Sequence, residues 1–111
     1  IHGGGFRSGN RSTGRQYAER LVPYGYVTLS ISYRLEQGDI WTVGMPAAVS
    51  DARQAVDWIR ANAAERRLDP DKILVGGSSA GAITALMLAY AYRLFKTRGT
   101  LDISRYTELK W

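Results

Sequence analysis

Residues 68–82 read LDPDKILVGGSSAGA, and this stretch decides the fold. An Asp-Pro-Asp turn (69–71) leads into a short apolar run (73–75), which continues into the pattern Gly-x-Ser-x-Gly (77–81). Short, continuously apolar runs are typical of strands buried on both faces, as in parallel sheets. Helical spacing resumes directly after the motif. The sequence therefore predicts a strand, a sharp turn that carries a serine, and a helix.

Ser79 is the predicted nucleophile. Gly77 and Gly81 flank it at the spacing of a nucleophile elbow, in which small neighbours let the backbone bend so tightly that the serine oxygen projects above the sheet. Ser78 does not fit the pattern, because that register requires a glycine where Ala80 stands. The alternative is an ordinary serine at the start of a helix, where serine is favoured in any case.

A second glycine cluster lies at residues 1–6, which read IHGGGF. Glycines lack a Cβ atom, so the backbone of such a loop can aim amide N–H groups inward at close range. Each donor of this kind contributes roughly 10²–10³ in rate when it stabilises the oxyanion formed by serine attack on an ester carbonyl. The helix after Ser79 adds its own first amides, of which that of Ala80 is the nearest.

The remainder of the chain alternates between strand-like and helix-like patterns. Such alternation is typical of βαβ units, in which helices cover a parallel sheet. We therefore expect an α/β fold with three layers, α/β/α, and a mainly parallel sheet, formed by a single domain over residues 1–111. The expected elements are the end of a strand at Ile1, a loop (1–14), a helix capped by Thr13 (15–24) and ended by Gly25, a strand (26–33), a helix with Pro46 in its first turn (46–65), a strand (73–75) and a helix ended by Gly99 (80–95).

Four segments resemble the α/β-hydrolase fold, in particular the HGGG-containing carboxylesterases related to hormone-sensitive lipase and the type-B carboxylesterases. They are IHGGGF (1–6), GYVTLSISYRL (25–35), PAAVSDARQAVDWIRANAAE (46–65) and LDPDKILVGGSSAGA (68–82), in the family's order. The resemblance implies a lipase-like serine esterase that acts on uncharged carboxylic esters, with a small-molecule ester as its substrate. It also implies that Ser79 is acylated and that the amides of Gly4, Gly5 and Ala80 form the oxyanion hole. Positions that look architectural in the family are Asp51, Trp58 and 69–71.

The chain departs from the family's pattern at several points. Ser78 stands where the best-known subfamilies carry an acidic residue, and Ala82 stands where glycine is common, so the subfamily and the substrate stay open. The triad acid and histidine follow the nucleophile in this fold, yet no histidine follows Ser79. We therefore expect a chain truncated at both ends, with acid and histidine supplied beyond Trp111. The alternative is a non-catalytic hydrolase-fold binding protein that has lost its base.

Two consequences follow from a truncated chain. The 111 residues alone are expected to be inactive, because the general base is missing from them. Strand edges and apolar faces are expected to be exposed, because the neighbouring strands are missing as well.

Other residues that could carry chemistry have simpler interpretations. His2 is the one histidine and lies on the glycine loop, where it is expected to hold that loop rather than act as the base. Asp51 and Asp57 are six residues apart on one expected helix and do not face each other, so a capping or solvated role is expected for both. The remaining candidates are two carboxylates expected at the surface (Asp102, Glu108) and three aromatic residues that line either an acyl pocket or the core (Trp41, Tyr90, Tyr92).

Composition excludes several classes of function. The 111 residues are 45% apolar and 23% charged, as in a globular domain, and they contain no cysteine for a disulfide, a thiolate zinc site or a cysteine nucleophile. The net charge of +5 comes from scattered arginines without a basic run, so nucleic acid is not an expected partner. No segment is long and apolar enough to span a bilayer.

No metal or organic cofactor is expected. The spacing of Gly76 and Gly81 imitates a phosphate loop, but Ala82 and Ile83 stand where lysine and Ser/Thr would be needed. The dinucleotide-binding fingerprint is absent as well. Because the sequence begins at Ile1 rather than at Met, a targeting segment and the compartment stay undetermined, as does the oligomeric state.

Overall fold

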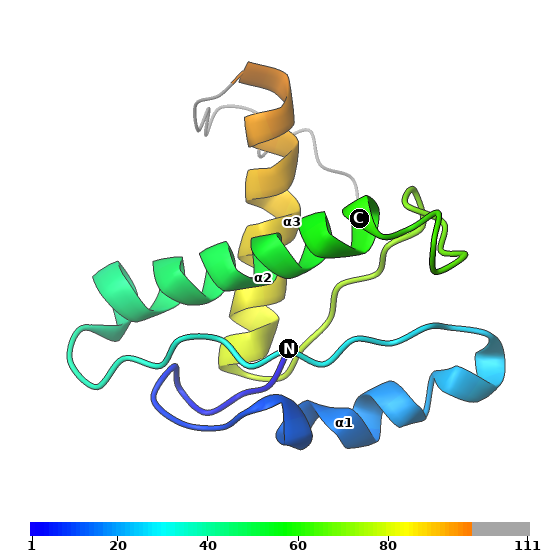
Figure 1. Cartoon of the computed structure of the whole chain (residues 1–111). Coiled ribbons are helices and arrows are strands. Elements are labelled where there is room, and N and C mark those ends of the chain that lie inside the picture. The colour runs from blue at the N-terminus through cyan, green and yellow to red at the C-terminus, as the bar shows by residue number, and fades with distance from the viewer. Residues whose placement is uncertain (99–111) are drawn as a thin grey trace.

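The computed structural model describes residues 1–98, with the side chains of residues 1–90. Helices and extended segments alternate through this range (Figure 1). The helices are α1 (Arg11–Glu19), the 3₁₀-helix η1 (Val22–Tyr24), the π-helical turn η2 (Ile40–Gly44), α2 (Met45–Ala61) and α3 (Ala80–Arg98). The predictions that fall outside the described residues are the helix stop at Gly99, the surface carboxylates Asp102 and Glu108, and the side chain of Tyr92.

Capping decides where α1 begins, and the predicted bounds of this helix were wrong. The side chain of Asn10 accepts a hydrogen bond from the N–H of Ser12 at 2.9 Å, so the helix starts at Arg11, before the predicted cap Thr13. After η1, Gly25 adopts a left-handed conformation with φ 85° and ends the helical turn as predicted, but the strand predicted over residues 26–33 does not form, and these residues are extended chain.

The second helix is preceded by a turn that the sequence did not predict. Asp39 caps η2, because its Oδ1 accepts from the N–H groups of Trp41 and Thr42, both at 3.0 Å. Helix α2 follows at once, with Pro46 in its first turn as predicted, and ends at Ala61 rather than at residue 65.

The core lies between α2, α3 and the extended segments. Ala52 and Val56 of α2 pack against Leu88 of α3 in one buried cluster. Partly buried side chains from three separate stretches of the chain cover this cluster: Ile1, Ile31, Ile73 and Val75. Figure 1 shows the extended chain after η1 running between α1 and α2, so helices lie on both sides of it.

No β-strand forms within residues 1–98, so the predicted sheet is not confirmed. One pair of hydrogen bonds does have the pattern of parallel strands. The amino group of Ile1 donates to the carbonyl of Gly76 at 2.7 Å, and the N–H of Ser78 donates to the carbonyl of Ile1 at 3.3 Å. The parallel sheet itself stays a prediction.

Residues 1 and 2 contact both extended segments, 26–33 and 72–76. The Tyr33 hydroxyl donates to the His2 carbonyl at 3.1 Å, and Ile1 packs on the same buried cluster as Ile31, Ile73 and Val75. These segments are extended but lack a strand partner in the part of the chain that the structure describes.

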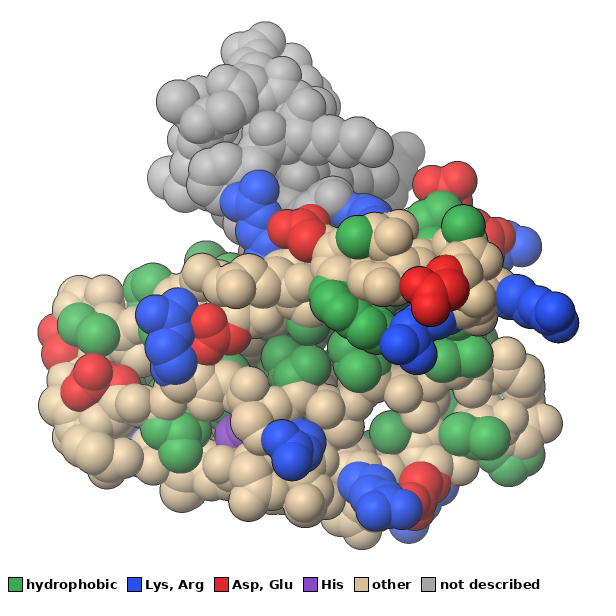
Figure 2. Space-filling model, viewed as in Figure 1, with side chains coloured by type: hydrophobic (Ala, Val, Ile, Leu, Met, Phe, Trp, Pro, Cys, Tyr) green, Lys and Arg blue, Asp and Glu red, His purple; other side chains and the backbone are tan. Residues whose placement is uncertain are grey.

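Apolar side chains are exposed along these segments, as expected for strands without neighbours. Val27 is 76% exposed and Leu74 is 73% exposed. Figure 2 shows apolar side chains on this face of the molecule beneath α2. No helix within residues 1–98 is long and apolar enough to cross a membrane.

Candidate active site

Ser79 occupies the sharp turn between the extended segment 72–77 and α3. Its φ is 52°, in the left-handed region that residues other than glycine rarely adopt. Strained backbone of this kind is typical of functional turns. The residue is exposed, so the turn presents it to solvent at the N-terminal end of α3.

The geometry of Ser79 differs from that of a serine that merely caps a helix. A capping serine has extended backbone, and its hydroxyl accepts from an amide of the first turn. Ser79 has a positive φ, and among the described residues its hydroxyl makes no hydrogen bond. Its carbonyl oxygen, by contrast, accepts from the N–H groups of Ala82 and Ile83, at 2.9 and 3.1 Å. Ser79 therefore does not cap α3 through its hydroxyl.

The two glycines of the motif are required by close backbone approach. A Cβ atom on Gly77 would lie 2.4 Å from the carbonyl carbon and oxygen of Gly81. A Cβ atom on Gly81 would lie 2.2 Å from the carbonyl oxygen of Ile1. Both distances are far below van der Waals contact, so the turn can pack against α3 and Ile1 only if both residues are glycine.

The glycine loop lies directly against the serine turn. A Cβ atom on Gly3 would be 2.9 Å from the Ser78 carbonyl oxygen and 3.2 Å from Cβ of Ser79. Gly4 and Gly5 follow with φ of 120° and 60°, in conformations that suit glycine. The sequence motifs at 1–6 and 77–81 are thus brought together in space.

Three amide groups at this junction have no hydrogen-bond partner. Within residues 1–98, the N–H groups of Gly4, Gly5 and Ala80 donate to no other atom. In contrast to its N–H group, the carbonyl of Gly4 does form hydrogen bonds. It accepts from the N–H groups of Arg7 and Ser8, at 3.0 and 3.1 Å, and these bonds close a turn. These free donors are the ones predicted to form the oxyanion hole.

His2 holds the glycine loop, as the sequence indicated. The side chain is buried, and its Nδ1 donates to the Gly3 carbonyl at 2.6 Å. The imidazole ring stacks on the ring of Tyr33, with centroids 4.1 Å apart and planes 9° from parallel. His2 forms no hydrogen bond to Ser79 among the described residues, and its buried Nε2 has no partner there.

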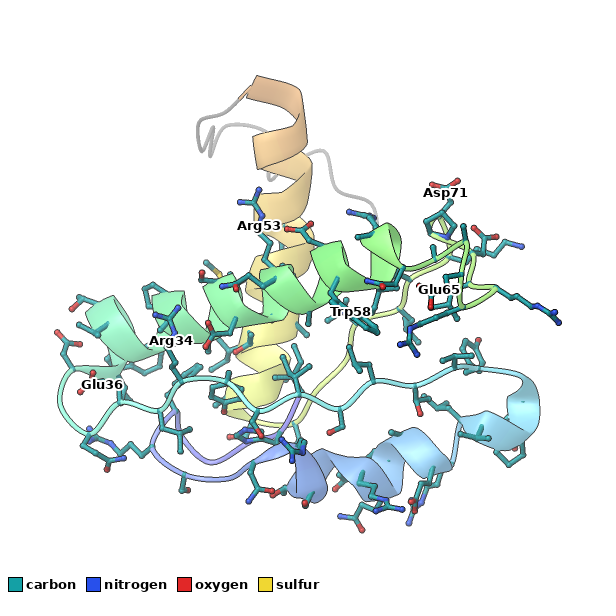
Figure 3. The ribbon with its side chains drawn as sticks, viewed as in Figure 1. Arg34, Glu36, Arg53, Trp58, Glu65 and Asp71 are labelled. Carbon is teal, nitrogen blue, oxygen red and sulfur yellow. The ribbon has the colours of Figure 1, made fainter. Side chains whose placement is uncertain are left out.

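Asp51 is paired with Arg34 and is 18% exposed, so the expected capping or solvated role was wrong, whereas the architectural role that the resemblance implies agrees with its contacts. Its carboxylate accepts from the backbone N–H of Arg34 at 2.8 Å and from the Arg34 guanidinium at 2.9 and 3.0 Å. Figure 3 shows Arg34 pointing from the extended chain towards α2. A signal was available, because Asp51 shares a helix face with the buried residues Ala48 and Ala52, where a carboxylate needs a cationic partner.

The other candidates occupy peripheral positions. Asp57 is solvated as predicted, with its Oδ2 3.8 Å from the Nε of Arg53. Trp41 is 59% exposed and packs edge-on against Phe6, with ring centroids 6.4 Å apart. No three His, Asp or Glu side chains within residues 1–98 group as metal ligands.

The Arg34–Asp51 pair makes stability depend on pH. Burial acts to raise the pKa of the Asp51 carboxyl, but hydrogen bonds from the side chain and N–H of Arg34, together with its charge, outweigh burial and lower the pKa below 3.8. A carboxyl with a lowered pKa contributes stability above its unfolded pKa and loses that contribution as the pH falls through its folded pKa.

Replacing Asp51 by asparagine is therefore expected to lower the midpoint of urea unfolding at pH 7, because the variant lacks this contribution. The difference from the wild type should shrink as the pH falls from about 4 through the lowered pKa of the folded-state carboxyl, because protonation then removes the charge from the wild type as well. The measurement is a pair of urea titrations of the full-length protein at pH 7 and at about pH 3. Asp57→Asn, which removes an exposed carboxylate from the same helix, is the matched control. An Asp51→Asn difference that is equal at both pH values would contradict the pairing.

Comparisons with known proteins identify the family of this chain. A family model described as BD-FAE matches residues 1–107. The chain is 34% identical over 82 residues to Esterase LipQ of Mycobacterium tuberculosis, 36% identical over 92 residues to Carboxylesterase NlhH of the same organism, and 33% identical over 103 residues to Lipase 1 of Geotrichum candidum. The comparison with solved structures gives no significant match.

The three alignments cover most of this chain but a small part of each relative. They include 74%, 81% and 83% of the 111 residues, in the order given above. The chain spans 18% of the length of LipQ, 28% of NlhH and 18% of Lipase 1.

Proposed function

The chain belongs to the BD-FAE family, an α/β-hydrolase family, and from this premise we propose that it carries the nucleophile and the oxyanion hole of a serine carboxylic-ester hydrolase. Its relatives are named as an esterase, a carboxylesterase and a lipase. The observation that carries the proposal is Ser79 at a strained turn, with the glycine loop against it and three unpartnered amides at the junction.

The reaction would proceed by acyl transfer. The Ser79 oxygen attacks the ester carbonyl, and the resulting oxyanion is held by the amides of Gly4, Gly5 and Ala80. The tetrahedral intermediate collapses to an acyl-enzyme with loss of the alcohol, and water then releases the acid. No metal or organic cofactor takes part in these steps.

The general base is proposed to be a histidine outside the 111 residues, oriented by an Asp or Glu. This follows because the Nδ1 of His2 is bonded to Gly3 and its ring is stacked on Tyr33, so the ring is held within the loop rather than directed at the serine. A base must reach the serine hydroxyl within hydrogen-bond distance. Proton transfer at the site therefore depends on residues that the full-length protein supplies.

Covalent labelling tests this proposal. The full-length protein is treated with a fluorophosphonate, digested, and analysed by mass spectrometry. We expect a single phosphonylated serine, Ser79, and loss of hydrolysis of p-nitrophenyl butyrate in step with labelling. An enzyme that hydrolyses the ester but is labelled on another serine would refute the assignment. A protein that is neither labelled nor active would favour the binding protein without a base.

The 111 residues alone are expected to show no turnover of a short-chain p-nitrophenyl ester above the buffer rate, because they contain no base for Ser79. The measurement is a direct assay of the isolated chain at several protein concentrations. Turnover that rises with concentration and disappears in Ser79→Ala would show that the missing base is not needed.

A further inference from the structure

A short segment that contributes nothing to the catalytic steps above is bonded to the glycine loop from outside. We call residues 34–38 the brace and residues 3–8 the oxyanion loop. The N–H of Glu36 donates to the Phe6 carbonyl at 2.8 Å, and the Nε2 of Gln37 donates to the Arg7 carbonyl at 2.8 Å. In return, the Arg7 guanidinium donates to the carbonyl of Gln37 and, at 3.1 Å, to that of Gly38. The bonds run in both directions.

The brace is anchored at its other end to α2. Arg34 is held there by Asp51 through its backbone N–H and its guanidinium. At the tip, the Glu36 carboxylate accepts from the N–H of Gly38 at 2.6 Å and so stiffens the turn. Figure 3 shows Arg34 and Glu36 on this stretch of chain beside the start of α2.

A close packing contact joins the brace, the oxyanion loop and η2. A Cβ atom on Gly44 would lie 3.0 Å from Cβ of Glu36 and 3.4 Å from Cβ of Phe6. Phe6 itself is 1% exposed and packs with Tyr33, Ala48 and Ala80. The brace therefore meets the oxyanion loop at Phe6, its one large buried side chain, which belongs to the same buried cluster as Ala80, the first residue of α3.

The oxyanion loop needs support of this kind. Gly3, Gly4 and Gly5 have no side chains that could hold them, and glycine is the residue with the most conformational freedom. An oxyanion donor works only when it is held in place before the reaction, within a few tenths of an ångström. Phe6 and Arg7 follow the glycines directly, so bonds to these two residues limit where the glycine amides can lie.

We propose that the brace positions the oxyanion hole, with Arg7 and Gln37 as positioning residues. This inference rests on the proposed ester hydrolase function. Arg7 acts through the loop backbone and does not touch the substrate. Its guanidinium spans two carbonyl groups, a geometry that a planar fork of donors fits and a lysine does not.

The test compares Arg7→Met and Gln37→Ala with wild type in the full-length protein, using p-nitrophenyl butyrate. Each variant is expected to lower kcat by about 10-fold with KM within about twofold, because misplaced oxyanion donors weaken binding of the transition state and not of the ester. Inhibition by a trifluoromethyl ketone, which forms an oxyanion on the serine, should weaken by a similar factor. Arg7→Lys keeps a donor and the charge but cannot reproduce the fork that spans both carbonyl groups, so it should recover only part of the loss.

Arg15→Met is the matched control. Arg15 lies on α1, is 76% exposed and pairs with Glu19, so its loss should leave kcat unchanged. If Arg7→Met does not fold, Gln37→Ala still tests the brace. It removes one hydrogen bond to the loop, and because Gln37 is exposed the variant is expected to fold.

The outcomes separate the two proposals. If wild type hydrolyses the ester through Ser79 while both variants keep kcat within about twofold, the positioning role of the brace is contradicted and the proposed function stands. A rise in KM alone, or a lower thermal midpoint with unchanged kcat, would also overturn the positioning role. If wild type has no activity that depends on Ser79, the proposed function fails first, and the brace inference fails with it.

Discussion

Replacing Ser79 by alanine is expected to lower kcat for ester hydrolysis by at least about 10⁴-fold in the full-length protein, since the acyl-enzyme cannot form without the serine oxygen. The fold should persist, because the Ser79 hydroxyl makes no hydrogen bond among the described residues and alanine keeps the same Cβ atom. The backbone at φ 52° is as strained for alanine as for serine. Thermal unfolding and steady-state kinetics of the purified variant measure the two effects separately.

Ser78→Ala provides the matched control, because Ser78 is the neighbouring serine and is also exposed. The hydrogen bonds that Ser78 makes involve its backbone. Its N–H donates to the Ile1 carbonyl, and its carbonyl accepts from the N–H of Gly81. The variant should keep kcat within about threefold, as expected for a surface change without lost contacts. Equal losses in the two serine variants would show that the turn, rather than the Ser79 hydroxyl, limits activity.

The second large effect is expected at Gly81. Alanine here would place Cβ 2.2 Å from the Ile1 carbonyl oxygen and 2.6 Å from that of His2, and both atoms belong to backbone that cannot rotate away. The glycine loop would have to move off α3, so we expect destabilisation of about 3 kcal/mol or more together with loss of activity. Urea unfolding of the full-length protein gives the free energy, and the ester assay gives the activity.

Gly76→Ala is the control for this change. Gly76 lies one residue before the motif, and a Cβ atom there would meet nothing within 4 Å. Its stability should be unchanged or slightly higher, because alanine restricts the unfolded chain. A Gly81→Ala protein as stable as wild type would mean that the loop and the turn are not in contact in solution.

Features that depend on local backbone geometry could be predicted from the sequence. The glycines at 77 and 81 identify a turn in which a Cβ atom would collide with backbone, and the structure places them at such a turn. The place of the glycine loop beside the serine is not a local feature; it was expected because the family resemblance implies an oxyanion hole there, and Gly3 does lie against the serine turn. The start of α2 followed from Pro46, because proline suits a first turn.

Features that depend on a choice between two suitable capping residues, or on side-chain partners far apart in the sequence, could not be predicted. Asn10 and Thr13 are both good capping residues, and only the structure shows that Asn10 starts α1. The Arg34–Asp51 pair joins residues 17 apart, and the bonds from Arg7 to the brace join residues about 30 apart. Neither has a local pattern. The sheet was expected from alternation, yet strand pairing needs hydrogen-bonded neighbours along the whole segment, and within residues 1–98 one pair of bonds, from Ile1 to Gly76 and from Ser78 to Ile1, has that pattern.

The bond between Ile1 and Gly76 joins residues 75 positions apart. Closing a loop of this length costs conformational entropy before any packing repays it, so contacts over such a separation slow folding more than local ones do. The glycine loop and the serine turn are each local structures, but their junction is not. During synthesis the nucleophile leaves the ribosome after the oxyanion loop, and the two cannot meet until the chain between them, including α1 and α2, has been made. A nascent chain carries both halves of the site without a working site.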